Sequence, residues 1–256
     1  MCTLVILRRP GHDWPVLIAA NRDEMRDRPW RPPGRHWPDR PEVVAGLDER
    51  AGGSWLGIND HGVVAGILNR VGSLGPAPDK RSRGELVLEA LDHADAADAA
   101  GALADLNGDA YRSFNMLIAD SRDAVWLRHD GGRAIELRPL PAGFSMLTAH
   151  DINSAESSRV REHLPRFEAA AVPDPDTGDW TSWQELLASR DSEPGHAPFG
   201  AMRIETDGGF GTISSSLIAL ARPKSEPRQP IWLFAQGPAG AHRFEPVELR
   251  RAAATS

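Results

Sequence analysis

Residues 2–24, CTLVILRRPGHDWPVLIAANRDE, decide how we expect the chain to fold. Two short apolar runs, residues 3–8 and residues 16–20, are rich in the β-branched side chains that favour strands. The PGHD stretch between them, at residues 10–13, has the chemistry of a turn. We therefore predict an antiparallel hairpin, whose open end places the start of the first strand beside the end of the second.

Four polar residues, Asn21, Arg22, Asp23 and Glu24, follow the second apolar run directly. The predicted hairpin makes them neighbours of Cys2. In that position Asp23 is suited to orient an α-amine, and Arg22 to hold a substrate carboxylate or to support Asp23. A solvated turn and a structural ion pair between Arg22 and Asp23 are the alternative interpretations.

Cys2 is the only cysteine of the chain and directly follows Met1. Removal of Met1 would leave a thiol and a free α-amine on the same residue. An α-amine has a pKa of about 7.7–8.0 and a free thiol one of about 8.5, so Cys2 would carry both a nucleophile and a general base. The alternative is that Cys2 is a small apolar side chain at the start of a buried strand.

The composition argues against several classes of protein. The chain has 256 residues and a formal net charge of -7, without a basic stripe, which argues against nucleic-acid binding. One cysteine allows no intramolecular disulfide framework and no cysteine-rich zinc site. Because the nine histidines are scattered along the chain, we expect no bound metal either.

The sequence also predicts where the protein works. A lone cysteine fits a reducing compartment, and the N-terminal residues lack the pattern of a signal peptide. The longest apolar runs are shorter than the about 20 residues needed to span a bilayer. We therefore expect a cytoplasmic protein without a membrane span, whose partner is a small-molecule substrate or ligand. The sequence does not decide between a monomer and a homo-oligomer.

The rest of the chain shows alternating groups of strand and helix patterns. Strands are predicted over residues 54–58, 63–68, 114–119, 124–128, 134–137, 144–148, 211–221, 231–235 and 242–247. Helices are predicted from Ser82 onward, with Glu85 completing a capping box, and over residues 94–106, 154–170 and 182–189. Residues 25–42, which hold five prolines, are predicted as a long irregular loop. This order predicts an α+β fold of mainly antiparallel sheets with helices outside, in one domain over residues 1–256.

Three further residues stand where a polar side chain can act on a substrate. Asn69 ends the apolar run of residues 63–68, and a side-chain amide there is a donor of the kind found in oxyanion holes. Asn115 lies within a strand pattern, and Arg83 lies at a helix start that could bind an anion. The structural alternatives are a turn at Asn69, a buried amide at Asn115 and a helix cap around Arg83.

These motifs occur together in the NRDE family, which this chain resembles over nearly its whole length. The resemblance is carried by the Met-Cys start, Asn21-Arg22-Asp23-Glu24, Gly53-Ser54-Trp55-Leu56-Gly57, Asn59-x-His61-Gly62, Asn69, Ser82-Arg83-Gly84 and Phe114-Asn115. The eukaryotic members of this family are called transport and Golgi organisation protein 2. The resemblance implies a fold like that of the N-terminal nucleophile hydrolases, a four-layer αββα sandwich of two mainly antiparallel sheets flanked by helices.

The resemblance also implies roles for individual residues. In cysteine members of that superfamily, such as penicillin V acylase and bile salt hydrolase, the N-terminal cysteine attacks an amide carbonyl. An aspartate assists the amine, and asparagines complete the oxyanion hole. By motif, Cys2 and Asp23 match the first two roles and Asn69 matches the third, while Arg22 supports the site. The implied substrate-binding residues are Asn21, Trp55, Asn115 and Arg83.

One position departs from the pattern of those amidases. They usually carry arginine three residues before the aspartate, where this chain has Ala20. Strand alternation aims Ala20 and Arg22 to the same face, so Arg22 is placed to substitute. The implied function is hydrolysis of a non-peptide C–N amide bond, without a cofactor. The alternative is a non-catalytic small-ligand or haem-trafficking protein that uses the same cleft, although no residue of the chain identifies a haem ligand.

Overall fold

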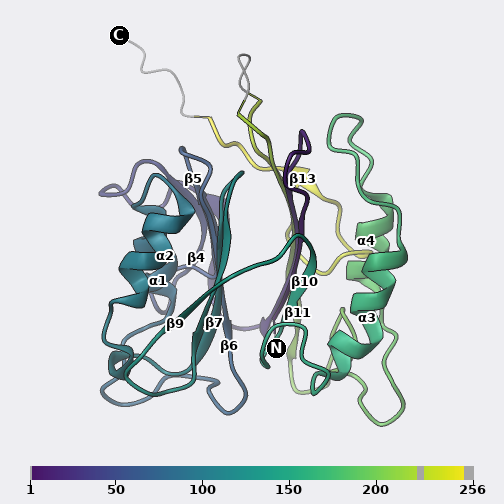
Figure 1. Cartoon of the computed structure of the whole chain (residues 1–256). Helices are drawn as coiled ribbons and strands as arrows, with labels where there is room; N and C mark the ends of the chain where they lie inside the picture. The colour runs from purple at the N-terminus through teal and green to yellow at the C-terminus, as the bar shows by residue number, and fades with distance from the viewer. Residues whose placement is uncertain (1, 224–227, 251–256) are drawn as a thin grey trace.

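Two antiparallel β-sheets lie face to face in the computed structural model, which describes residues 2–223 and 228–250 (Figure 1). Helices α1 (Gly84–Leu91) and α2 (Ala96–Ala104) cover the outer face of one sheet. Helices α3 (Ser158–Ala169) and α4 (Thr181–Ala188) cover the outer face of the other. The predicted α+β fold, a four-layer αββα sandwich, is therefore confirmed.

The six-stranded sheet contains the hairpin predicted at the start of the chain. Its strands, in the order β10-β1-β2-β11-β12-β13, are β10 (Gly143–Leu147), β1 (Thr3–Arg8), β2 (Val16–Met25), β11 (Phe210–Leu220), β12 (Ile231–Ala235) and β13 (Glu245–Pro246). Strands β1 and β2 pair antiparallel, with Thr3 opposite Asn21 and Arg8 opposite Val16. The hairpin predicted from residues 2–24 is confirmed, and its open end brings the start of β1 beside Asn21 as expected.

The second strand of this hairpin is longer than predicted. It runs through Met25, so the four polar residues from Asn21 to Glu24 lie inside β2 and do not follow it as a turn. The reason is the pairing of β2 with β11, which places Arg22 opposite Ser214 and Asp23 opposite Thr212. A strand from the far end of the chain supplies backbone partners that the local sequence does not reveal.

The seven-stranded sheet follows the chain order. Its strands are β3 (Trp30–Gly34), β4 (Val43–Asp48), β5 (Leu56–Asn59), β6 (Val64–Asn69), β7 (Phe114–Ala119), β8 (Ala124–His129) and β9 (Glu136–Pro139). The prediction of an irregular loop over residues 25–42 is wrong at β3, which pairs with β4 in spite of its prolines. Because β3 is an edge strand, a residue without an N–H group is tolerated there.

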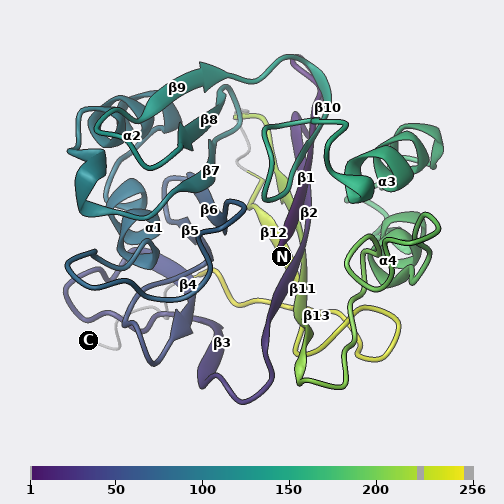
Figure 2. The same ribbon diagram turned by 90° about the horizontal axis from the view of Figure 1, so that it is seen from below.

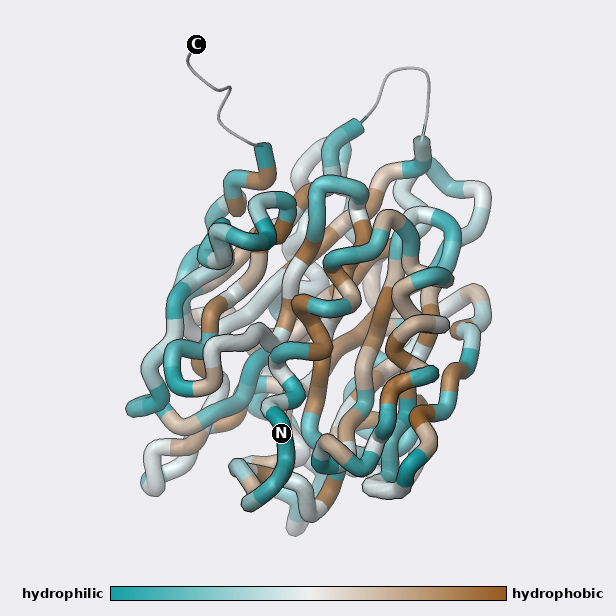
Figure 3. Tube along the Cα trace, turned by 90° about the vertical axis from the view of Figure 1, so that its left-hand side faces the viewer, coloured by the Kyte–Doolittle hydropathy of each residue, from teal (hydrophilic) through white to brown (hydrophobic). Residues whose placement is uncertain are grey.

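Apolar side chains fill three spaces: one between the two sheets, and one between each sheet and its helices. Figure 3 shows the brown, hydrophobic segments gathered in the interior and the hydrophilic ones at the loops. Strand β1 serves two of these spaces, because its alternate side chains point to opposite faces. Leu4 packs between the sheets and Val5 packs against the helices. The same alternation places Cys2 in the cluster between the sheets.

The start of α1 differs from its prediction. The helix begins at Gly84, after Arg83, and no side chain caps it, so the capping box of Ser82 and Glu85 does not form. Glu85 instead accepts a hydrogen bond from the hydroxyl of Tyr111 at 2.7 Å. This contact spans 26 residues of sequence and overrides the local capping preference. A short 3₁₀ helix, η1 (Gly108–Ala110), precedes Tyr111.

The helices of the described residues are short. Within residues 2–223 and 228–250, no helix combines the length and the apolar character needed to cross a membrane.

Candidate functional site

The open end of the β1–β2 hairpin belongs to the six-stranded sheet, where Figure 2 shows the N-terminus in the view from below. The side chain of Cys2 packs into the space between the two sheets. A pocket opens there, and both Cys2 and Arg22 line it. Its other walls are mainly apolar and come from both sheets; they include Leu4, Leu56, Ile67 and Leu68. The sandwich therefore brings the start of β1 to a small, mostly apolar space. Met1, whose removal would free the α-amine of Cys2, lies outside the described residues.

Cys2 is half-buried, and its thiol donates a hydrogen bond to the main-chain oxygen of Asp23, at a distance of 3.6 Å from sulfur to oxygen. Burial of the thiol raises its pKa above the usual value, and the negative charge of Asp23 adds to this effect. The positive charge of Arg22 acts in the opposite direction and lowers the pKa of Cys2. Arg22 is thus the neighbouring side chain that stabilises a thiolate.

Asp23 points to the other face of the sheet, toward the helices. One carboxylate oxygen accepts a hydrogen bond from Nη1 of Arg159 at 3.1 Å, and the other accepts one from the hydroxyl of Thr212 at 2.7 Å. Arg159 lies in α3 and also donates to the hydroxyl of Thr3. All four side chains are buried. Asp23 is thereby held in one position directly beside the start of β1.

Sequence reasoning missed Arg159. Its only signal is its place beside Val160 on the apolar face of α3, where a charged residue needs a buried partner. Thr212 was also missed, because its contact with Asp23 depends on the pairing of β11 with β2. Neither residue belongs to a local motif.

Arg22 is held mainly by aromatic side chains. Its guanidinium carbon lies 3.7 Å from the ring centre of Trp55 and 5.7 Å from that of Trp30. Its Nη2 atom lies 3.7 Å from a carboxylate oxygen of Asp48. Burial lowers the pKa of Arg22, and the negative charges of Cys2 and Asp48 oppose this. Ala20 packs in the same cluster between the sheets as Trp30 and Trp55, which confirms that Ala20 and Arg22 share a face of β2.

Asn21 has a role within the fold. Its side-chain amide nitrogen donates to the main-chain oxygens of Leu187 and Met202, each at 2.9 Å. Its amide oxygen accepts a hydrogen bond from the hydroxyl of Ser215 at 2.7 Å. The side chain therefore connects the sheet to the end of α4 and to the segment around Met202. Binding of a substrate by Asn21 stays a prediction.

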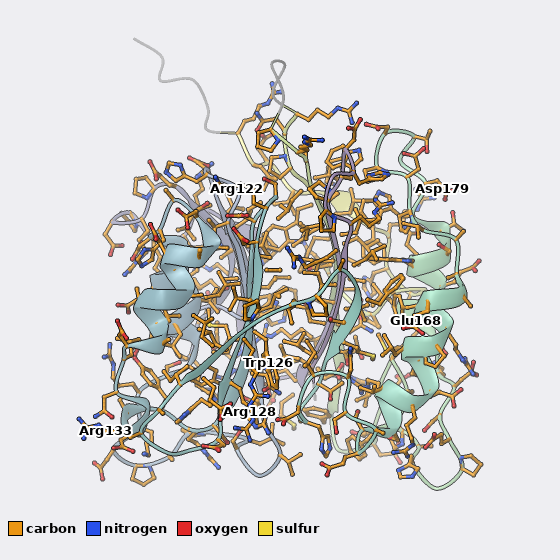
Figure 4. The ribbon with its side chains drawn as sticks, in the orientation of Figure 1. Arg122, Trp126, Arg128, Arg133, Glu168 and Asp179 are labelled. Carbon is orange, nitrogen blue, oxygen red and sulfur yellow. The ribbon has the colours of Figure 1, made fainter. Side chains whose placement is uncertain are left out.

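Asn115 is likewise fully engaged. Its amide nitrogen donates to the main-chain oxygens of Thr148 and His150, and its oxygen accepts from Arg70 and from Nε1 of Trp126. These contacts join the two sheets at the end of the molecule where Figure 4 labels Trp126 and Arg128. The side-chain amide of Asn115 thus donates two hydrogen bonds and accepts two, and it connects the two sheets.

Asn69 and Arg83 lie at the rim of this end. Asn69 is the last residue of β6 and pairs with Phe114. Arg83 donates to the hydroxyl of Ser73 and to the main-chain oxygen of Ser113, both at 2.9 Å. Burial and the nearby Arg112 lower the pKa of Arg83 to about 10, while the charge of Cys2 opposes this shift. Of the predicted site residues, the structure thus places Cys2, Asn21, Arg22 and Trp55 in the lining of one pocket. Asp23, Asn69, Asn115 and Arg83 lie outside that lining.

Across residues 2–223 and 228–250, no three side chains of histidine, cysteine, aspartate or glutamate converge as metal ligands would. What the arrangement offers is a thiol, a nearby guanidinium and a fixed carboxylate on the opposite face of the strand.

The raised pKa of Cys2 predicts how its reactivity depends on pH. In the folded chain the alkylation rate should rise through a midpoint above the about 8.5 of a free thiol, because only the thiolate reacts. Arg22→Gln should move the midpoint to still higher pH, since it removes the charge that lowers this pKa. Labelling with iodoacetamide, followed by intact mass, reports on this one cysteine alone. The chain unfolded in denaturant is the reference; a folded midpoint at or below the unfolded one would contradict the assignment.

Comparisons with known proteins give two kinds of similarity. A family model described as Transport and Golgi organisation 2 matches residues 1–222. The Transport and Golgi organization 2 homolog of Mus musculus is 36% identical over 110 residues, which is 41% of this chain and 38% of the mouse protein. The Homo sapiens homolog is 36% identical over 112 residues, with the same two shares. The match therefore spans well under half the length of these curated relatives.

Solved structures show the same fold at low sequence identity. An N-acylethanolamine-hydrolyzing acid amidase ortholog of Caenorhabditis elegans has a TM-score of 0.55 and 13% identity, and the match covers 88% of this chain and 95% of that one. A variant of the conjugated bile acid hydrolase of Clostridium perfringens has a TM-score of 0.55 and 12% identity, over 97% and 92% of the two chains. Penicillin V acylase of Agrobacterium tumefaciens has a TM-score of 0.50 and 14% identity, over 92% and 83%. At these identities the similarity is one of fold.

Proposed function

The chain belongs to the Transport and Golgi organisation 2 family, and from this premise and the geometry of the pocket we propose that it is a cysteine N-terminal nucleophile amidohydrolase. Its substrate would be a non-peptide amide. The observation that carries the proposal is the place of Cys2, at the start of β1 in a pocket between the sheets and beside Asp23. Three proteins that share its fold are named as amidase, acylase or hydrolase.

The proposed reaction begins with removal of Met1, which frees the α-amine of Cys2. The neutral amine takes the thiol proton, directly or through water, and the thiolate attacks the amide carbonyl carbon. The carbon–nitrogen bond then breaks, and the leaving nitrogen receives the proton from the amine. Water hydrolyses the resulting thioester, which releases the carboxylic acid and restores the thiol.

The fixed position of Asp23 supports its role in this reaction. Cys2 directly precedes Thr3, which pairs with Asn21, so the freed α-amine would lie beside the strand that carries Asp23. Arg159 and Thr212 hold that carboxylate in place. Arg22 lowers the pKa of the thiol and so favours the attacking thiolate.

The remaining roles are proposed on the family pattern. Asn69, at the end of β6, is the proposed donor to the oxyanion that forms on the carbonyl. Trp55 lines the pocket and would contact the substrate next to Arg22. Arg83 is near enough for the charge of Cys2 to affect its pKa, which supports a place at the rim of the site.

The haem-binding alternative finds little support in this pocket. Among the described residues that line the pocket, Cys2 alone has a side chain that commonly ligates haem iron, and none of the others is histidine, methionine or tyrosine. These lining residues therefore fit haem poorly.

An insertion variant tests whether the α-amine of Cys2 takes part. Alanine placed between Met1 and Cys2 keeps the thiol but moves the free amine to another residue. We expect amide hydrolysis to fall by about a hundredfold or more, the usual effect of losing a general base. Turnover of a panel of amides, compared with the unmodified chain, measures the effect.

A thermal melt is the control for the fold of this variant. Both chains should melt at similar temperatures, because the insertion precedes Thr3, the first paired residue of β1. Equal turnover by the two chains would show that the amine is not the base.

A further inference from the structure

One side chain that lines the pocket has a buried hydrogen-bond donor without an acceptor among the described residues. Arg22 is 6% exposed and lines the pocket together with Cys2. Within the part of the chain that the structure describes, its Nη1 atom is buried without a hydrogen-bond partner. Leaving such a donor unpaired costs free energy, which an acceptor brought by a ligand would recover.

The surroundings of Arg22 restrict where that acceptor can come from. The rings of Trp55 and Trp30 lie at 3.7 and 5.7 Å from the guanidinium carbon. The carboxylate of Asp48 lies 3.7 Å from Nη2, which is beyond hydrogen-bond distance. Asp48 is itself engaged by Nε of Arg28 at 2.8 Å. The guanidinium is therefore fixed in place while part of its donor capacity stays unused.

The rest of the pocket favours a ligand that is apolar apart from one charged group. Leu4, Leu56, Ile67 and Leu68 provide walls suited to a hydrocarbon chain. Since Thr3 pairs with Asn21, the next residues outward on the two strands, Cys2 and Arg22, are neighbours across the ladder. Such neighbours have Cβ atoms about 4.5–5.5 Å apart. An anion bound by Arg22 therefore lies close to the carbon that the thiolate would attack.

We propose that Arg22 selects amides that carry a carboxylate next to the amide group, with the carboxylate accepting a hydrogen bond from Nη1 and the acyl chain packing against the apolar walls. This inference rests on the proposed amidohydrolase function, because it places the scissile amide at Cys2. Arginine suits the task because its guanidinium remains charged and matches the planar carboxylate.

A binding experiment on the Cys2→Ala protein tests the inference without requiring catalysis. The probes are N-hexanoylglycine and N-hexanoylethanolamine, which share the acyl chain and the amide and differ in carboxylate against hydroxyl. Calorimetric titration should show that the glycine compound binds about tenfold to a hundredfold more tightly, as expected for a charge-assisted hydrogen bond. Equal affinities, or binding of neither probe, would overturn the inference.

Variants at two arginines locate the preference. In the Cys2→Ala background, Arg22→Gln should abolish the difference between the probes, and Arg22→Lys should retain part of it. The matched control is Arg28→Gln, which removes a cation from the same cluster around Asp48 but does not line the pocket. The Arg28→Gln protein should still bind the glycine compound more tightly than the ethanolamine compound. If Arg28→Gln loses this preference and Arg22→Gln keeps it, the assignment to Arg22 is wrong.

The outcome is separable from that of the proposed function. If the Cys2→Ala protein prefers the carboxylate probe but the unmodified chain hydrolyses neither compound, the binding inference stands and the amidase proposal fails. If amides are hydrolysed without any preference for the carboxylate, the amidase proposal stands and the binding inference fails.

Discussion

Replacement of Cys2 by alanine is expected to lower amide hydrolysis by about a thousandfold or more, since it removes the nucleophile of the proposed reaction. No second cysteine can substitute, because the chain has only one. The fold should survive, because Cys2 precedes the first paired residue of β1 and is only half-buried. Turnover of an amide substrate, together with a thermal melt of each protein, measures both effects.

Cys2→Ser is the conservative comparison for this variant. It keeps a polar nucleophile of similar size, but a hydroxyl is far less ionised than a thiol at neutral pH. We expect Cys2→Ser to lose most of the turnover while melting like the unmodified chain. Full turnover by the Cys2→Ala protein would exclude Cys2 as the nucleophile.

Replacement of Asp23 by alanine is expected to destabilise the fold and to abolish hydrolysis together. It removes a buried carboxylate that accepts from Arg159 and Thr212. Taking one partner from a buried ion pair typically costs about 3–5 kcal/mol, because the other charge stays buried. Unfolding in urea, followed by fluorescence of the tryptophans, measures the stability loss.

Two further variants separate the structural role of Asp23 from its proposed catalytic role. Asp23→Asn keeps oxygen and shape, so it should unfold less readily than Asp23→Ala and still lose turnover. Adding Arg159→Met to Asp23→Ala removes both charges and should recover part of the stability but no activity. Asp27→Ala, at an exposed position four residues further on, is the matched control and should change stability by less than about 0.5 kcal/mol. If Asp23→Asn leaves the turnover unchanged, the role of Asp23 is structural and not catalytic.

The local pattern of the sequence predicted the hairpin and what it brings together. The hairpin of β1 and β2 follows from two apolar runs and a turn, and it alone makes Cys2 a neighbour of the polar residues of β2. Alternation along β2 likewise placed Arg22 and Ala20 on one face. These features depend on short stretches of chain, where the strand propensity of the residues and the two-residue period of a strand suffice for a prediction.

Contacts between distant parts of the chain could not be predicted in this way. Asp23 is fixed by Arg159, which is 136 residues away, and by Thr212, which is 189 residues away. The extension of β2 through Met25 depends on pairing with β11 and not on its own composition. The proline-containing strand β3 exists because it has an edge position beside β4.

The same limit applies to the pocket. The sequence shows Trp30, Asp48 and Trp55 as separate residues of a polar, glycine- and proline-containing region. Only the folded sheets bring them around Arg22. Sequence reasoning therefore found the residues that react in the proposed mechanism more readily than those that hold them.

If Cys2 is an N-terminal nucleophile, amide hydrolysis passes through an acyl group on its sulfur. Mass spectrometry of the protein quenched in acid during turnover of an amide detects this intermediate. We expect a chain that lacks Met1 and carries the mass of the acyl group, mapped by fragmentation to the sulfur of Cys2. A chain that hydrolyses the amide while retaining Met1, or whose acyl group maps to another residue, would exclude this mechanism.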